Sequence, residues 1–178
     1  MNGYDVTEIM NTFRVVADTR EQKTPRASER FKALGDSLER GVLDYGDYCG
    51  NITLPSGSAL HDISERIYAP CVIERKMSLE ELSGCLTRDR DRFRREMDRA
   101  MDGKAKVYLM VENGSYEAIM NHRYKTKFYP AAFLASVIAW EIRYDLSVIF
   151  CKSAVSGALI KEILFRDMKE RLERGEYG

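Results

Sequence analysis

Several features that mark common protein classes are missing from these 178 residues. The four cysteines (Cys49, Cys71, Cys85 and Cys151) form no Cys-x-x-Cys pair, so zinc-knuckle and redox-motif interpretations have little support. No Gly-x-Gly-x-x-Gly or P-loop motif occurs at a strand-to-helix turn, and a nucleotide-binding module is therefore not expected. We expect the cysteines to be reduced interior residues of a cytosolic protein.

Long apolar runs and an excess of one charge are also missing. The most apolar window, "PAAFLASVIAW" at 130–140, stops at Glu141, and no N-terminal segment has the composition of a signal peptide. We expect a soluble protein with no membrane partner. Lys plus Arg equals Asp plus Glu at 28 each, so a nucleic-acid site would have to arise from local segregation of charge.

Short apolar strands alternate with helical patterns along the chain, which indicates an α/β fold with a central mixed sheet flanked by helices. The length suits one domain, and we expect a flexible lead-in over 1–12 followed by a single domain over 13–178. The strands are predicted over 13–19, 71–76, 106–112 and 146–151, and the main helices over 27–41, 79–102, 130–144 and 153–174.

The stretch "PCVIERK" at 70–76 places three charged residues at the end of a strand that reads as buried on both faces. Successive side chains of a strand point to opposite faces, so Glu74 and Lys76 share one side while Arg75 points to the other. Open α/β folds build functional sites at the carboxyl ends of such strands.

Acidic residues recur at strand ends and turns: Asp18 and Glu21 in "ADTRE", Asp47 in "YGDY" and Glu74 in "IERK". If the sheet brings Asp47 and Glu74 together, their hard oxygens suit Mg²⁺ or Mn²⁺. Lys76 beside that metal could orient a water or stabilise a phosphate, which is the chemistry of phosphodiester hydrolysis. Taken alone, Gly-Asp-Tyr is more typical of a structural turn than of a metal site.

The order of these motifs resembles the nuclease domain of XPF-type structure-specific endonucleases, a branch of the PD-(D/E)XK superfamily. The matching segments are "VVADTRE" at 15–21, "GDY" at 46–48 and "IERK" at 73–76, with a helical pattern between the first two. The resemblance extends over about residues 13 to 170 and implies a restriction-endonuclease-like core. The Glu-Arg-Lys triplet after Gly-Asp is its most specific part.

The resemblance also implies roles for the site residues. Asp47 and Glu74 match the metal ligands, helped by the main-chain carbonyl of Arg75, and Lys76 matches the catalytic lysine. Asp18 and Glu21 match acidic residues that line the same site.

Two arginines of the motifs have implied roles of a different kind. Arg20 matches an arginine that meets a phosphate or orients a carboxylate. Arg75 matches the family's central arginine, whose side chain we expect to point away from Lys76 toward other carboxylates.

The sequence departs from the family pattern in two respects. The acidic residue expected three positions after the lysine falls on Glu80, whereas the following residues align better if Glu81 takes that role; Ser78 as helix cap favours carboxylates at both positions. Many relatives also carry a helicase module or tandem helix-hairpin-helix motifs, which this chain lacks. DNA affinity is therefore expected from dimerisation, a partner protein or the domain surface.

The best local source of DNA affinity is the helical segment 86–101. One stripe of it is basic, at Arg88, Arg92, Arg95 and Arg99. Acidic residues interleave with this stripe, and a solvated face of paired charges is an equally good interpretation.

Together these observations favour a Mg²⁺-dependent DNA endonuclease, with Mn²⁺ as a possible substitute, acting on branched or flapped DNA in repair, recombination or phage-related replication. We expect a homodimer or a DNA-binding partner protein. The alternatives are a non-catalytic DNA-binding or scaffolding subunit and a sequence-specific PD-(D/E)XK nuclease. The expected location is the cytoplasm of a bacterial, archaeal or phage-infected cell, or the nucleus if the source is eukaryotic.

Overall fold

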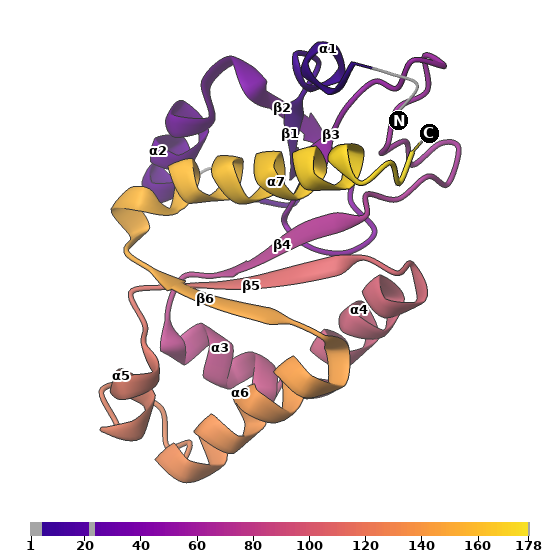
Figure 1. The fold of residues 1–178 in the computed structure, drawn as a ribbon. Helices are drawn as coiled ribbons and strands as arrows, with labels where there is room; N and C mark the ends of the chain where they lie inside the picture. The colour runs from indigo at the N-terminus through magenta and orange to yellow at the C-terminus, as the bar shows by residue number, and fades with distance from the viewer. Residues whose placement is uncertain (1–4, 22–23, 178) are drawn as a thin grey trace.

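A six-stranded sheet crosses the middle of the molecule, with helices on both faces (Figure 1). The computed structural model describes residues 5–21 and 24–177. The strands are β1 (Arg14–Asp18), β2 (Leu38–Gly41), β3 (Tyr48–Asn51), β4 (Cys71–Lys76), β5 (Lys106–Glu112) and β6 (Ser147–Cys151).

The strand order is β2-β1-β3-β4-β5-β6, and the sheet is mixed. Strand β3 runs antiparallel to both β1 and β4, whereas the β1–β2, β4–β5 and β5–β6 pairs are parallel. The predicted mixed α/β architecture is confirmed. Because β1 and β4 run the same way, their carboxyl ends lie at one edge of the sheet, on either side of the start of β3.

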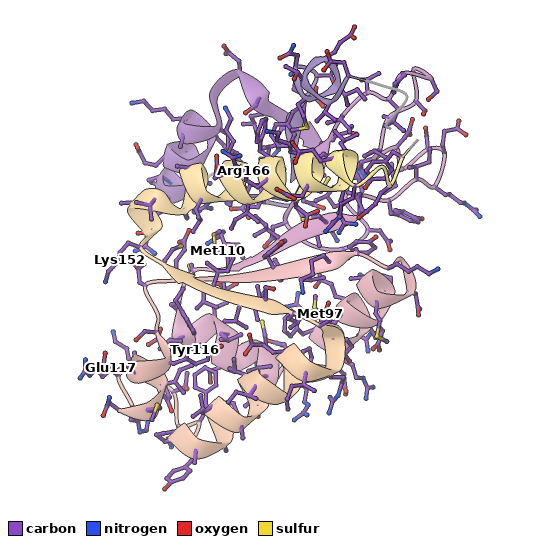
Figure 2. All side chains as sticks on the ribbon, in the orientation of Figure 1. Met97, Met110, Tyr116, Glu117, Lys152 and Arg166 are labelled. Carbon is purple, nitrogen blue, oxygen red and sulfur yellow. The ribbon has the colours of Figure 1, made fainter. Side chains whose placement is uncertain are left out.

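Two helical layers cover the sheet (Figure 1). One layer contains α1 (Val6–Met10), α2 (Pro25–Leu34) and α7 (Ser156–Glu173), and the other contains α3 (Leu79–Leu86), α4 (Arg90–Asp102), α5 (Tyr116–Met120) and α6 (Pro130–Tyr144). In Figure 2, Met110 lies on the α7 side of the sheet and Met97 of α4 lies on the opposite side.

Alternate strand residues feed two separate cores. Val72 joins the core under α3, α4 and α6, while Ile73 joins the core under α7. The alternation continues to the end of β4, so Glu74 and Lys76 face the α3–α4 layer and Arg75 faces the α2–α7 layer. The alternation of side chains along β4 thus places its charged groups in two different layers of the molecule.

Two predicted helices have different boundaries in the structure. The helix predicted over 27–41 ends at Leu34, because Gly35 takes a positive φ of 55°, and residues 38–41 form β2 instead. The helix predicted over 79–102 is two helices. Its first part ends at Leu86, and the hydroxyl of the following Thr87 donates to the carbonyl of Ser83 at 2.7 Å.

The predicted flexible lead-in over 1–12 is only partly within the described residues. Residues 6–10 form α1, and Ile9 and Met10 are buried against the α7 side of the sheet. Asp5 starts this helix, since its carboxylate accepts the N–H of Thr7 at 2.8 Å. Among the described helices, none is both long and apolar enough to cross a membrane.

Candidate active site

A cavity of about 360 Å³ opens where β1, β3 and β4 meet the α3–α4 layer. Its walls are strongly charged. Acidic and basic side chains from all three predicted motifs line it, together with two acidic residues of the helices: Asp18, Asp47, Glu74, Lys76, Glu81 and Glu96. The sheet therefore brings together Asp47, Glu74 and Lys76, which is the condition that the sequence analysis set for a metal site.

Asp47 is held in a turn between two strands. Its N–H donates to the carbonyl of Ile73 at 2.8 Å, and its own carbonyl accepts the N–H of Asp18 at 2.9 Å. Gly46 before it has φ of 75°, and a side chain there would lie 2.9 Å from Cβ of Val72. The carboxylate of Asp47 accepts the backbone N–H of Arg75 at 2.8 Å, which fixes one of its oxygens beside the end of β4.

Glu74 and Lys76 form an ion pair inside the cavity, between Nζ of the lysine and Oε1 of the glutamate. Nζ also lies 5.1 Å from the centre of the Phe93 ring, which is buried under α6. The second oxygen of the glutamate, Oε2, is buried and has no hydrogen-bond partner within the described residues. A buried carboxylate oxygen that accepts no hydrogen bond is suited to contact a cation.

The electrostatics of the cavity favour a cation too. Burial raises the pKa of Asp47, and the nearby charge of Glu74 raises it further. Burial also raises the pKa of Glu74, although Lys76 opposes this effect. Burial lowers the pKa of Lys76, but Glu74 and Asp47 outweigh it and the net pKa is raised, so the lysine stays charged. Hard oxygens with unbalanced negative charge fit Mg²⁺ or Mn²⁺.

Asp18 lies in the same cavity, but both of its oxygens are already engaged. They accept the N–H and guanidinium of Arg20 at 2.6 to 2.9 Å and the N–H of Leu43 at 3.0 Å. Burial raises the pKa of Asp18, yet these bonds lower it by more. Asp18 therefore orients Arg20, whose side chain remains 67% exposed at the rim.

A buried charge cluster occupies the opposite face of the sheet. Arg75 contacts Glu21 at 3.3 Å and Glu112 at 3.4 Å, which confirms that its side chain points away from Lys76. Arg30 of α2 pairs with both glutamates and donates to the hydroxyl of Tyr48 at 3.1 Å. Glu21 contacts the side chain of Arg75 in this cluster and also lines the cavity at the end of the sheet.

Two members of this cluster, Arg30 and Glu112, were not predicted from the sequence. Arg30 carried a signal, because it occupies the buried position between Ala27 and Leu34, where the helical spacing calls for an apolar residue. A charged residue on the buried face of a helix must find a partner in the interior. Glu112 is fully buried and is the last residue of β5. Its position resembles that of Glu74, which lies two residues before the end of β4.

The predicted arginine stripe is divided by the break between α3 and α4. Arg88 lies in that break and pairs with Asp89, so it is not on α4. Arg92 lines the cavity, Arg95 is exposed on α4, and Arg99 donates to the carbonyl of Asp44 at 3.0 Å. Only Arg92 of this stripe borders the candidate active site.

The two acidic residues after the lysine face different surroundings. Glu81 lines the cavity and accepts the N–H of Met77 at 2.7 Å. Glu80 instead accepts the N–H of Lys125 at 2.9 Å. The structure therefore favours Glu81 as the acidic residue that accompanies the Glu-Arg-Lys triplet.

Comparisons with known proteins agree with this geometry. The ERCC4 domain family matches residues 17–163, which include the charged residues of all three motifs. XPF from Aeropyrum pernix has a similar fold, with a TM-score of 0.61 and 19% identity over 92% of this chain and 69% of that one. XPF from the same organism in complex with DNA gives a TM-score of 0.60 and 20% identity over 89% and 66% of the two chains. No curated protein matches the sequence. The predicted resemblance to the XPF-type nuclease domain is confirmed.

Proposed function

The chain belongs to the ERCC4 domain family, and on that premise we propose that it is a divalent-metal-dependent DNA endonuclease that cuts branched or flapped DNA. One observation carries the proposal. Asp47, Glu74 and Lys76, which come from two separate motifs, line one cavity with a buried, unpartnered carboxylate oxygen among the described residues. A stable fold does not need this arrangement, because burying unpaired charge costs free energy.

Asp47 and Glu74, with the main-chain carbonyl of Arg75, are the groups that would hold Mg²⁺, or Mn²⁺ in its place. When bound, such an ion supplies an activated water and stabilises negative charge on a phosphate. The buried Glu74 is fixed at its Oε1 by Lys76 and presents Oε2 to the ion. Asp47 is fixed by the backbone of Arg75, so neither ligand has to be ordered on binding.

Lys76 and the rim arginines act on the DNA in this proposal. The ammonium of Lys76 lies within the cavity, where it can donate to a phosphate oxygen or to the attacking water. Arg20 and Arg92 are exposed at its edge and can contact neighbouring phosphates. Arg95 is exposed one turn of α4 further on and can extend that contact.

A cleavage assay tests the function. Labelled single strand, linear duplex, 3′ flap, fork and Holliday junction are incubated with Mg²⁺ or Mn²⁺. We expect metal-dependent cuts near the branch, and we expect Glu74→Gln or Lys76→Ala to reduce the rate by at least about 100-fold. Lys152→Ala, at an exposed lysine that does not line the cavity, is the control and should cleave normally.

Other outcomes separate the alternatives. Full activity in both cavity variants would contradict the site assignment. Tight binding of branched DNA without cleavage would favour a scaffolding subunit, and cuts confined to one sequence in linear duplex would favour a sequence-specific nuclease.

We further propose that the protein is a homodimer that uses the outer face of α6. Tyr129, Ile138 and Ile142 are 72%, 43% and 79% exposed on or beside this helix. Their spacing places the two isoleucines on one side of α6, while Trp140 of the same helix is buried in the core. An apolar stripe of this kind on a surface helix is typical of a helix-helix interface.

A further inference from the structure

Glu96 lies in the candidate active site, although none of the three motifs includes it. Phe93 and Met97 of the same helix are buried, and they fix the rotation of α4 so that Glu96 faces the cavity. Figure 2 shows Met97 directed from α4 toward the sheet. One oxygen of Glu96, Oε1, accepts the N–H of Gly46 at 3.1 Å. Glu96 therefore reaches the turn that carries Asp47.

With every side chain ionised, the cavity carries an excess of negative charge. Three of its acidic side chains have a basic partner: Asp18 with Arg20, Glu21 with Arg75, and Glu74 with Lys76. Of the remaining charged groups lining the cavity within the described residues, three are carboxylates and one is a guanidinium: Asp47, Glu81, Glu96 and Arg92. The excess negative charge matches one divalent cation.

A second observation marks the position of that cation. The side chain of Glu74 is 4% exposed, it lines the cavity, and its Oε2 finds no donor in the parts of the chain that the structure describes. Glu74 and Glu96 line the same cavity, from β4 and α4 respectively.

We propose that Glu96 supplies a third carboxylate to the metal centre and also holds the Gly46–Asp47 turn in place. This inference rests on the proposed function for the presence of a metal. A carboxylate has two oxygens, so Glu96 can accept the N–H of Gly46 with one and bind the cation with the other. In the described residues no three ligand-type side chains converge on one point, so the proposal requires the side chain of Glu96 to move toward Glu74 when the metal binds.

Calorimetric titration with Mn²⁺ tests the inference directly, because it needs no catalysis. We expect Glu96→Gln to weaken Mn²⁺ binding by at least about 10-fold. Gln keeps an oxygen that accepts the Gly46 N–H, so the variant should fold, and its circular dichroism and melting temperature verify this. Asp91→Asn removes the same charge from an exposed position on the same helix and should bind Mn²⁺ within about twofold of wild type.

A second titration in about 1 M KCl separates a ligand from a remote charge. At this salt concentration, the electrostatic effect of a charge on Mn²⁺ affinity is screened beyond a few ångströms. The loss of affinity caused by removing a direct metal ligand should remain. Wild-type affinity in Glu96→Gln, or a defect that vanishes in high salt, would overturn the role of Glu96.

The same titrations distinguish this inference from the proposed function. Asp47→Asn should also weaken Mn²⁺ binding. If Asp47→Asn loses the metal while Glu96→Gln keeps it, the metal centre stands and the role of Glu96 fails. If wild type binds Mn²⁺ through Glu96 but cleaves no DNA, the role of Glu96 stands and the nuclease activity fails. If wild type binds no Mn²⁺, both are wrong.

Discussion

The backbone and the side chain of Arg75 act on opposite faces of the sheet. Its N–H fixes the carboxylate of Asp47 in the cavity, while its guanidinium contacts Glu21 and Glu112 in the buried charge cluster. Displacement of the side chain would therefore shift the end of β4 and with it the candidate metal ligands. The cluster is best understood as the support that keeps this strand end in position.

The first prediction concerns Glu112. Glu112→Gln removes the carboxylate that two buried or nearly buried arginines share, Arg30 and Arg75. We expect the free energy of unfolding in urea to fall by about 3 kcal/mol, because an uncompensated charge remains in the interior. Glu162→Gln is the control. It breaks an exposed pair with Arg166, and its effect should be below about 0.5 kcal/mol. Equal effects would contradict the supporting role.

The second prediction concerns pH. Burial raises the pKa values of Asp47 and Glu74 in the folded protein without metal, so above about pH 4 the folded state binds more protons than the unfolded state. The free energy of unfolding should therefore decrease as pH rises from about 5 to neutrality. Saturating Mg²⁺ should flatten this dependence.

Glu74→Gln provides the comparison for this pH dependence. The variant should lose less stability than wild type over the same interval, because one of the two groups no longer titrates. Taking the difference between the proteins removes the contribution of His61, whose pKa is lowered mainly by burial. A steeper pH dependence in Glu74→Gln would show that the carboxyl pair is not the source.

At the scale of the elements, the turn before β3 is the feature on which the site most depends. Gly46 combines a positive φ with a close approach to Val72, whereas Gly57 has a similar φ of 83° and no heavy atom within 4 Å of the position that a Cβ would occupy. The two glycines therefore share backbone strain on substitution but differ in the space available to a side chain.

The third prediction compares alanine at these two glycines. Gly57→Ala should cost about 1 kcal/mol of unfolding free energy from its backbone conformation. Gly46→Ala should cost at least about 1 kcal/mol more, because its Cβ must displace Val72, and it should also weaken Mn²⁺ binding. Chemical unfolding and the metal titration measure both effects. Similar stability losses would mean that the turn relaxes around the methyl group.

The elements were predictable where an apolar run or a helical period is uninterrupted, as in β4, β5 and α6. The helical period was misleading over 27–41, since Leu38 fits a helical spacing but Gly35 ends the helix and the following residues form an edge strand. Edge strand β2 has only half-buried and exposed residues, so its pattern is weak.

In the candidate site, too, features with a local sequence pattern were predictable and features without one were not. The ligand-type residues at strand ends follow from alternation and motif order, which are local. The partners of Arg75 and the position of Glu96 depend on how α2, α4 and β5 pack against the sheet, and pairwise contacts between distant segments leave no period in the sequence. Arg30 was not predicted either, although its position on the buried face of a helix was a signal that could have identified it.

At the scale of the whole molecule, the fourth prediction concerns the homodimer. Ile142→Glu places a charge on the exposed face of α6, and we expect a shift from dimer to monomer in light scattering at micromolar concentration. Ile63→Glu, at a residue 40% exposed in the loop before β4, should leave the dimer intact. A monomeric wild-type protein would refute the dimer proposal.

The packing of α6 links its outer face to Lys76 of the candidate active site. Trp140 stacks on Phe93 with ring centres 4.8 Å apart, and Nζ of Lys76 lies over that same phenylalanine ring. Trp140 is the single tryptophan of the chain. Trp140 lies between the cavity on one side and the surface of α6 on the other. Its intrinsic fluorescence can therefore report changes at either place without any added label.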